Sequence, residues 1–155
     1  MYNAKNVFRD MKKFFAIFAV ALLALVGCEN KTNGPAGSSD IDGQWHIVEW
    51  NGEAPEFDVY VDFNKGEFDI YQQVYSLYYE HFEGTYNVSG DIITGSYADG
   101  SNWASGYKFE VNGSELKLMS QEDKSIVSVY ERCEIPQGVI DEAATTRAAD
   151  AKPIF

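Results

Sequence analysis

The side chains that could act as acids, bases or metal ligands are few and scattered. There are two histidines, His46 and His81, and both lie in predicted strands among aromatic or β-branched neighbours. A metal site would need them to converge, and no third ligand stands at a metal-binding spacing. The acidic residues are spread over turns and strands without forming an acid–base pair, and Ser105 lacks the context of a nucleophile elbow. The sequence therefore predicts no catalytic site, no metal site and no cofactor.

Cys28 is the residue at which covalent chemistry is expected. It follows two lysines and an apolar run over residues 14–26, whose 13 residues are fewer than the ~20 that a membrane-spanning helix needs. The order of charged, apolar and small residues is typical of a secretory signal. Residues 1–27 are therefore interpreted as a signal peptide, with Met11 as an alternative start to Met1.

The run Leu25-Val26-Gly27-Cys28 resembles the lipoprotein box of bacterial lipoproteins. The resemblance implies cleavage before Cys28, acylation of its thiol, and the membrane as a partner. Several acyl chains, at ~0.8 kcal/mol per buried CH₂, would anchor the protein stably. The next residue is Glu29 and does not resemble an inner-membrane retention signal. The expected location is the outer membrane, facing either the periplasm or the outside.

The charge of the chain limits its partners. The leader removes four of the 12 basic residues and one of the 24 acidic residues, so the rest carries 8 basic and 23 acidic residues, a net charge of −15. Such a surface repels phosphate backbones and excludes nucleic acid as a partner. The only other cysteine is Cys133, so acylation of Cys28 leaves no intramolecular disulfide. Stability must then come from the core of a single domain.

Composition divides the remaining chain into three parts. Residues 28–42 are rich in Asn, Gly and Ser and predict a flexible tether after the lipidated cysteine. Residues 43–132 are rich in aromatic and β-branched residues and predict the folded domain. Residues 133–155 contain Pro136 and an alanine-rich patch, and they fit either a short helix or a disordered tail.

Two hairpins are predicted from turn signals. A two-residue turn at Asn112-Gly113 pairs Phe109 with Leu116 and sets Glu110 across from Glu115. A second turn around Asn64-Lys65-Gly66 gathers apolar side chains on one face by two pairings, Phe63 with Phe68 and Val61 with Ile70.

Further strands are predicted over residues 44–50, 78–88, 91–97 and 125–132. The stretch 71–82 also fits helical spacing, and we interpret it as strand, loop, strand. About eight short antiparallel strands in succession suit an up-and-down barrel or a sandwich.

The opening Gly43-Gln44-Trp45 resembles the Gly-x-Trp at the first strand of lipocalins, and Gly84–Gly100 is similar in rhythm to lipocalin-like lipoproteins of Bacteroidetes. The resemblance implies an all-β, eight-stranded antiparallel up-and-down barrel. It also implies that Trp45 closes one end, with Arg132 over its ring as a cation–π contact of ~0.5–2 kcal/mol. A barrel confined to residues 43–132 is shorter than a full lipocalin, which implies a smaller cavity.

Aromatic side chains are the candidates for a ligand site, because Tyr and Trp combine an apolar ring with a polar atom. The candidates are Trp50, Tyr60, Tyr71, Tyr79, Tyr86, Tyr97, Trp103 and Tyr107. A plainer interpretation is that half of them face outward as strand formers.

The sequence thus predicts non-catalytic binding of a small hydrophobic or amphiphilic ligand. The alternative is a solid-core barrel that docks on an envelope protein. An open lumen above ~300 Å³ would favour the first and a filled lumen the second.

Overall fold

A computed structural model of the chain describes residues 38–145 and 152–155. All of these belong to the second of the two compact units into which the chain divides, Gly34–Phe155. The predicted signal peptide, Cys28 and most of the predicted tether lie outside the described residues. No helix in the described ranges is long and apolar enough to cross a membrane.

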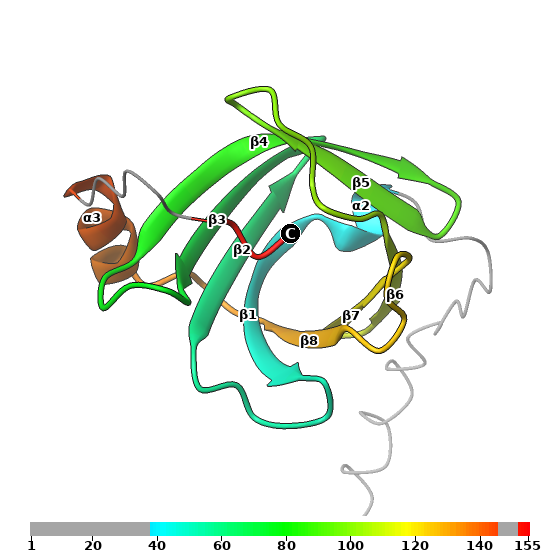
Figure 1. Cartoon of the computed structure of the whole chain (residues 1–155), viewed down its shortest axis with the longest axis horizontal. Coiled ribbons are helices and arrows are strands. Elements are labelled where there is room, and N and C mark those ends of the chain that lie inside the picture. Colours follow the sequence, from blue (N-terminus) through cyan, green and yellow to red (C-terminus); the bar gives the residue numbers. More distant parts are fainter. Residues whose placement is uncertain (1–37, 146–151) are drawn as a thin grey trace, which may run out of the picture. The chain divides into compact units, whose positions relative to one another are not determined.

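Eight strands form a closed antiparallel barrel in which each strand pairs with its neighbours in sequence and β8 returns to β1 (Figure 1). The strands are β1 (Gly43–Trp50), β2 (Asp58–Asn64), β3 (Glu67–Gln73), β4 (Glu80–Ser89), β5 (Ile92–Tyr97), β6 (Tyr107–Asn112), β7 (Glu115–Ser120) and β8 (Val127–Arg132). This confirms the predicted eight-stranded up-and-down barrel and excludes the alternative of a β-sandwich. Closure leaves the barrel without a free sheet edge.

The hairpin of β2 and β3 has the predicted register. Phe63 pairs with Phe68 and Val61 with Ile70, and all four side chains are buried inside the barrel. The connecting residues Lys65 and Gly66 have φ of 53° and 95°. Positive φ at both central positions is what a type I′ turn requires, and this turn matches the twist of the two strands.

The predicted register of the β6–β7 hairpin is wrong by two residues. Phe109 pairs with Leu118, and Glu110 faces Lys117. The turn consists of Gly113 and Ser114, and of these only Gly113 has positive φ. A glycine at the first central position is the pattern of a type II′ turn, so Asn112 ends β6. The shift replaces the expected repulsion of two glutamates with an opposite-charge pair.

One end of the barrel is closed by a tryptophan. Trp45 is completely buried, and its Nε1–H donates to the carbonyl oxygen of Ile41 at 2.8 Å, in the short helix α2 (Ser38–Ile41). The guanidinium carbon of Arg132 lies 4.1 Å from the centroid of the Trp45 ring. Gly43 leaves room for this, because a Cβ there would lie 2.2 Å from Arg132 Nη1.

The last part of the chain lies on both sides of the barrel wall. Helix α3 (Gln137–Thr145) packs outside β3 and β4 and buries Val139 and Ala143. Of the two predicted alternatives, a short helix or a disordered tail, the structure has the helix over residues 137–145. The final segment, Lys152–Phe155, then crosses the opposite, open end of the barrel, drawn in red in Figure 1. We call Lys152–Phe155 the mouth segment.

Candidate ligand-binding site

The eight aromatic candidates do not form one site. Tyr86, Tyr97, Trp103 and Tyr107 are buried in the core of the barrel. Tyr60 and Tyr71 alternate with buried residues of β2 and β3, so they stand on the outer face. Tyr79 lies with them, since its hydroxyl donates to Asp58, which is also an outer-face residue of β2. These three tyrosines do not line the lumen.

Trp50, the remaining candidate, lies at the end of β1 and is half-buried. Its ring meets Phe57 edge-on, with centroids 5.6 Å apart. Both residues pack against the core. Trp50 therefore belongs to the open end of the barrel, at the margin of the core.

Phe155 fills an aromatic pocket at the open end of the barrel. Its ring centroid lies 4.6 Å from that of Trp103 and 5.4 Å from that of Tyr107. The Tyr97 hydroxyl donates to the backbone oxygen of Phe155 at 2.9 Å. Only 4% of Phe155 is exposed, so a residue outside the sheet completes the core here.

A glutamine inside the barrel holds the rest of the mouth segment. Gln72 projects inward from β3 and is 0% exposed. Its Nε2–H donates to the carbonyl oxygen of Lys152 at 2.8 Å, and its Oε1 accepts from the N–H of Ile154 at 2.9 Å. One side-chain amide thus satisfies a backbone acceptor and a backbone donor on either side of Pro153. We call Gln72, Tyr97, Trp103 and Tyr107 the mouth pocket.

Buried polar atoms in the barrel wall have unused hydrogen-bonding capacity. Trp103 Nε1, Tyr130 Oη and Glu80 Oε2 are buried and have no hydrogen-bond partner among residues 38–145 and 152–155. Ser128 lies close to the Tyr130 hydroxyl, but no well-formed hydrogen bond joins the two. Burial raises the pKa of Tyr130 and Tyr97, so both phenols stay protonated at neutral pH. An unsatisfied buried polar group costs ~1–3 kcal/mol, which a bound partner could recover.

The deeper lumen is filled by side chains of the strands. Ring contacts run inward from the mouth pocket, since Phe68 lies 5.2 Å from Trp103 and 5.6 Å from Tyr97. The largest fully buried side chains are Trp45, Tyr130, Phe63, Phe68 and Phe109. The lumen is therefore solid below the mouth, and at the mouth it is filled by residues 152–155, which belong to no strand.

The family model of the lipocalin-like domain matches residues 41–118, half of the chain. The chain belongs to the lipocalin-like domain family. This confirms the family predicted from Gly43-Gln44-Trp45, whereas the lipoprotein box stays a prediction.

Two solved structures are similar to this lipocalin-like chain. One is a lipocalin-like protein from Bacteroides uniformis, with 20% identity and a TM-score of 0.49, and the match covers 61% of this chain and 99% of that one. The other is an uncharacterized protein from Bacteroides eggerthii, with 18% identity and a TM-score of 0.47, covering 59% and 98%. No curated protein matches the chain.

A glycine admits Trp103 into the lipocalin-like barrel. A Cβ at Gly95 would lie 2.2 Å from Trp103 Cε2, so only glycine lets the indole lie against β5. The backbone N–H of Trp103 also donates to the carbonyl oxygen of Gly95 at 3.0 Å. A glycine inside a strand signals such a close approach, and this signal was available in the sequence. Gln72, Glu80, Tyr130 and Phe155 were missed, and nothing near Phe155 in the sequence marks it.

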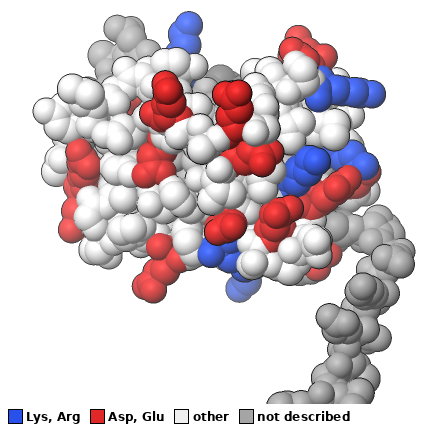
Figure 2. Space-filling view, turned by 90° about the horizontal axis from the view of Figure 1, so that it is seen from below, with Lys and Arg blue, Asp and Glu red and all other residues white. Residues whose placement is uncertain are grey.

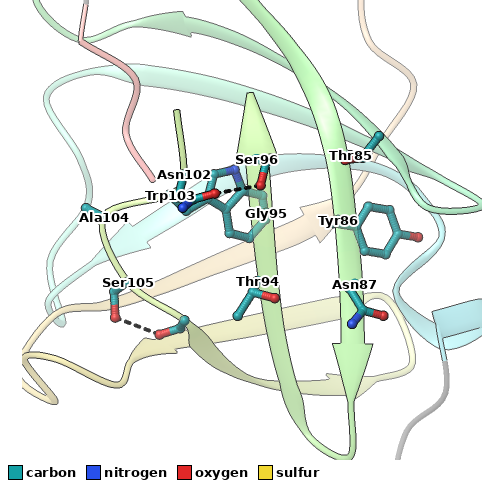
Figure 3. Close-up of a pocket in the computed structure, with 11 residues that line it drawn as sticks. Thr85, Tyr86, Asn87, Thr94, Gly95, Ser96, Asn102, Trp103, Ala104 and Ser105 are labelled. Carbon is teal, nitrogen blue, oxygen red and sulfur yellow. Dashed lines mark hydrogen bonds between the residues drawn. The ribbon is translucent and has the colours of Figure 1, made fainter. Parts of the chain in front are cut away.

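A second hollow lies on the wall of the lipocalin-like barrel, where β5 pairs with β6 through only two residue pairs. Its volume is about 500 Å³, and it is lined mostly by polar side chains of β4, β5 and residues 102–106 (Figure 3). Trp103 lines both this hollow and the mouth pocket. More of its lining is polar than apolar, so it suits a hydrophobic ligand less well than the mouth pocket does.

The outer face of the lipocalin-like barrel carries a row of rings across four strands. His46, Tyr60, Tyr71 and His81 pair in register from β1 to β4. His46 stacks on Tyr60 with centroids 4.4 Å apart, and Tyr71 stacks on His81 at 4.8 Å. The row explains the outward tyrosines Tyr60 and Tyr71 as ring partners of the two histidines, which are separated by strands β2 and β3.

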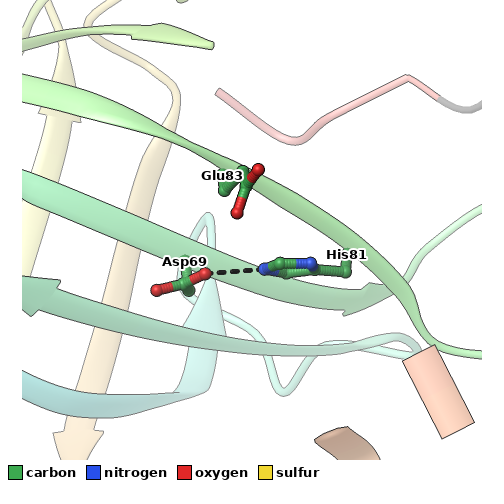
Figure 4. A group of neighbouring side chains, drawn as sticks. All are labelled: Asp69, His81 and Glu83. Carbon is green, nitrogen blue, oxygen red and sulfur yellow. Dashed lines mark hydrogen bonds and ion pairs between the residues drawn. The ribbon is translucent and has the colours of Figure 1, made fainter. Parts of the chain in front are cut away.

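Each histidine of this row meets an aspartate, at 2.5 Å for His46–Asp58 and 2.7 Å for His81–Asp69. Glu83 joins the second pair, so three side chains place metal-type ligand atoms within 4.8 Å of one another (Figure 4). Asp69 is half-buried, and His81 and Glu83 are exposed. Exposed groups of this kind are common without an ion, and we assign the His81–Asp69 contact to a hydrogen bond.

Tyr86 joins the barrel wall to its closed end. Its hydroxyl donates to a carboxylate oxygen of Asp42, and its ring meets Phe63 edge-on at 5.1 Å. Burial, and then this hydrogen bond, raise the pKa of Tyr86 to about 12. Tyr86 is therefore a structural residue of the closed end and no part of the mouth pocket.

Proposed function

We propose that this lipocalin-like protein binds a small hydrophobic or amphiphilic molecule, without catalysis, in the mouth of its barrel. The carrying observation is that the mouth pocket is occupied by Phe155, a side chain that no strand supplies. Moving residues 152–155 away would open a pocket walled by Tyr97, Trp103 and Tyr107 and would break no pairing between strands. Such a pocket is mostly apolar with a few converging polar groups, as ligand sites are.

The rim of the mouth supports an apolar ligand. The loop from β3 to β4 exposes three large apolar side chains: Tyr75 is 73% exposed, Leu77 85% and Tyr78 60%. Large apolar groups gathered on a surface mark sites of contact with ligands, membranes or partners. The unpaired Nε1–H of Trp103 offers a hydrogen bond to the polar end of an amphiphile.

The alternative function, a solid-core module that docks on an envelope protein, has its own supporting observation. The lumen below the mouth holds large buried side chains, among them Phe63, Phe68 and Phe109, and a lumen filled by side chains is what this alternative predicts. Acidic side chains are spread over the face shown in Figure 2, where basic ones are fewer, and such a face suits a cationic partner.

For location, we propose that Cys28 carries the lipid and holds the domain at the outer membrane through residues 28–42. In the native host, Cys28→Ser should abolish incorporation of a radiolabelled fatty acid such as palmitate. Labelling of Cys28→Ser at the wild-type level would refute the anchor.

The binding function is tested with a fluorescent hydrophobic probe and a neighbouring pair of substitutions. Val74 packs against the core just beyond β3, whereas Tyr71 stands on the outer face of β3. Val74→Trp should narrow the mouth and lower probe affinity about tenfold, since lost apolar contacts of ~1.4 kcal/mol weaken binding by that factor. Tyr71→Trp, the matched control on the outer face, should bind as the wild type does. Equal affinity in all three proteins would count against a site in the mouth.

A further inference from the structure

The hydrogen bonds from the mouth pocket to the mouth segment are made to its backbone. Gln72 donates to the carbonyl oxygen of Lys152 and accepts from the N–H of Ile154, and the Tyr97 hydroxyl donates to the backbone oxygen of Phe155. Pro153, between the first two, has no N–H to satisfy. These contacts would form with any extended peptide in the same position. Side-chain selection falls on Ile154 and Phe155, which pack against the core.

We propose that the mouth pocket is a peptide-binding site, which takes an extended segment with an aliphatic residue followed by an aromatic one, and that residues 152–155 are its intramolecular occupant. This inference rests on the proposed function and names the class of its ligand. Peptides usually gain backbone hydrogen bonds by pairing with a free sheet edge. A closed barrel has no such edge, and Gln72 supplies the donor and the acceptor that a neighbouring strand would.

Gln72 also discriminates between ligand classes. Its side chain is completely buried inside the barrel, and within the described part of the chain its amide makes two hydrogen bonds, both to the mouth segment. A hydrocarbon chain in the same place would leave the buried amide without partners, which is unfavourable. A peptide satisfies its donor and its acceptor together. The pocket therefore favours a ligand with amide groups over a fatty acyl chain.

The mouth segment competes with any free peptide for the mouth pocket. Because residues 152–155 belong to the same chain as the pocket, they act at a high effective concentration and outcompete a free peptide of equal intrinsic affinity. Removing the Phe155 ring weakens the tethered occupant and leaves the rest of the pocket in place. A free peptide should then bind more tightly, because the fraction of molecules with an open pocket increases.

The test uses the peptide Lys-Pro-Ile-Phe, blocked at both ends and labelled with a fluorophore, and follows its anisotropy with the mature chain. Phe155→Ala should bind it at least about tenfold more tightly than the wild type. Adding Gln72→Leu to Phe155→Ala should reduce the affinity by about tenfold or more. The control, Gln73→Leu with Phe155→Ala, changes the outward-facing neighbour and should bind as Phe155→Ala does.

Two further measurements show that the result does not arise from misfolding of a variant and identify which molecule supplies the bound segment. The peptide Lys-Pro-Ile-Ala should bind Phe155→Ala at least about tenfold more weakly than Lys-Pro-Ile-Phe, with no change in the protein. The oligomeric state of the wild type shows which molecule supplies the segment. If the wild type is a dimer that the peptide dissociates, a second copy supplies it and the intramolecular assignment is wrong. If the wild type is a monomer, residues 152–155 occupy the pocket of their own chain.

Two results would overturn the inference. If Phe155→Ala binds a fluorescent fatty acid but not the peptide, the peptide assignment is wrong and the proposed function stands. If it binds neither, both are wrong. Equal peptide binding with and without Gln72→Leu would refute the role of the amide.

Discussion

Replacing Gly84 with alanine should destabilise the barrel by about 3 kcal/mol or more, at the upper end of the range for an overpacked core. A Cβ at this position would lie 2.1 Å from the carbonyl oxygen of Ser96 and 2.9 Å from the Cα of Tyr97. Both are backbone atoms of β5, and the ring of Phe68 closes the remaining side at 2.8 Å. A side chain could rotate away, whereas here β4 and β5 must separate and lose hydrogen bonds.

The matched control is Gly138→Ala in α3. A Cβ at Gly138 would meet nothing within 4 Å, and alanine favours a helix over glycine by ~1 kcal/mol. The free energy of unfolding, from urea titrations of both variants, should therefore fall for Gly84→Ala and stay equal or rise for Gly138→Ala. A loss below about 0.5 kcal/mol for Gly84→Ala would contradict the close approach of β4 and β5, since ordinary surface substitutions stay in that range.

Trp45→Ala should cost ~3–5 kcal/mol, as removal of a fully buried large aromatic side chain does. The substitution empties the closed end, removes the hydrogen bond to Ile41 and leaves Arg132 without its ring. The loss is measured as the change in the free energy of unfolding.

A double-mutant cycle separates the ring contact from the cavity. Trp45→Leu and Arg132→Met, alone and combined, should give a coupling of ~0.5–2 kcal/mol, the range of cation–π contacts. The Arg132 single variant also loses bonds to backbone oxygens of Asp40 and Asp42, and the cycle cancels these. Coupling near zero would show that the stacked arginine does not stabilise the closed end.

Local patterns were enough to predict most strands and one hairpin register, whereas the choice of a barrel over a sandwich came from the resemblance of Gly43-Gln44-Trp45 to lipocalins. The alternation in Val59–Phe63 and Phe68–Gln72 shows which side chains face inward, and the two-residue turn at Lys65-Gly66, with positive φ at both positions, fixes their register. The same alternation already separates Tyr60 and Tyr71 from the lumen, since they stand between inward-facing residues. The prediction that eight aromatic residues share one ligand site did not take this inward–outward alternation into account.

The register of β6 and β7 shows a limit of turn signals. Asn112-Gly113 and Gly113-Ser114 are both acceptable two-residue turns, and they differ by two residues in register. Either one puts the same side chains inside, so burial does not choose between them. The pairing of Glu110 with Lys117 is one difference in favour of the observed register.

The mouth pocket could not be predicted, because its parts come from distant regions of the chain. Gln72 breaks the apolar alternation of β3, and its partners lie some 80 residues later. Phe155 reaches Trp103 and Tyr107 only after α3 has passed outside the barrel. Local periodicity carries no information about such contacts. An inward polar residue in an apolar strand nonetheless signals a partner inside the lumen.

The central claim is that the mouth holds a ligand in place of residues 152–155, and mass spectrometry of molecules co-purified with a protein of residues 28–155 tests it most directly. The account predicts a small hydrophobic, amphiphilic or peptidic compound in extracts of the wild type. It should be enriched in Phe155→Ala and depleted in Val74→Trp. Indistinguishable extracts from all three proteins would contradict a ligand site in the mouth and favour the solid-core module.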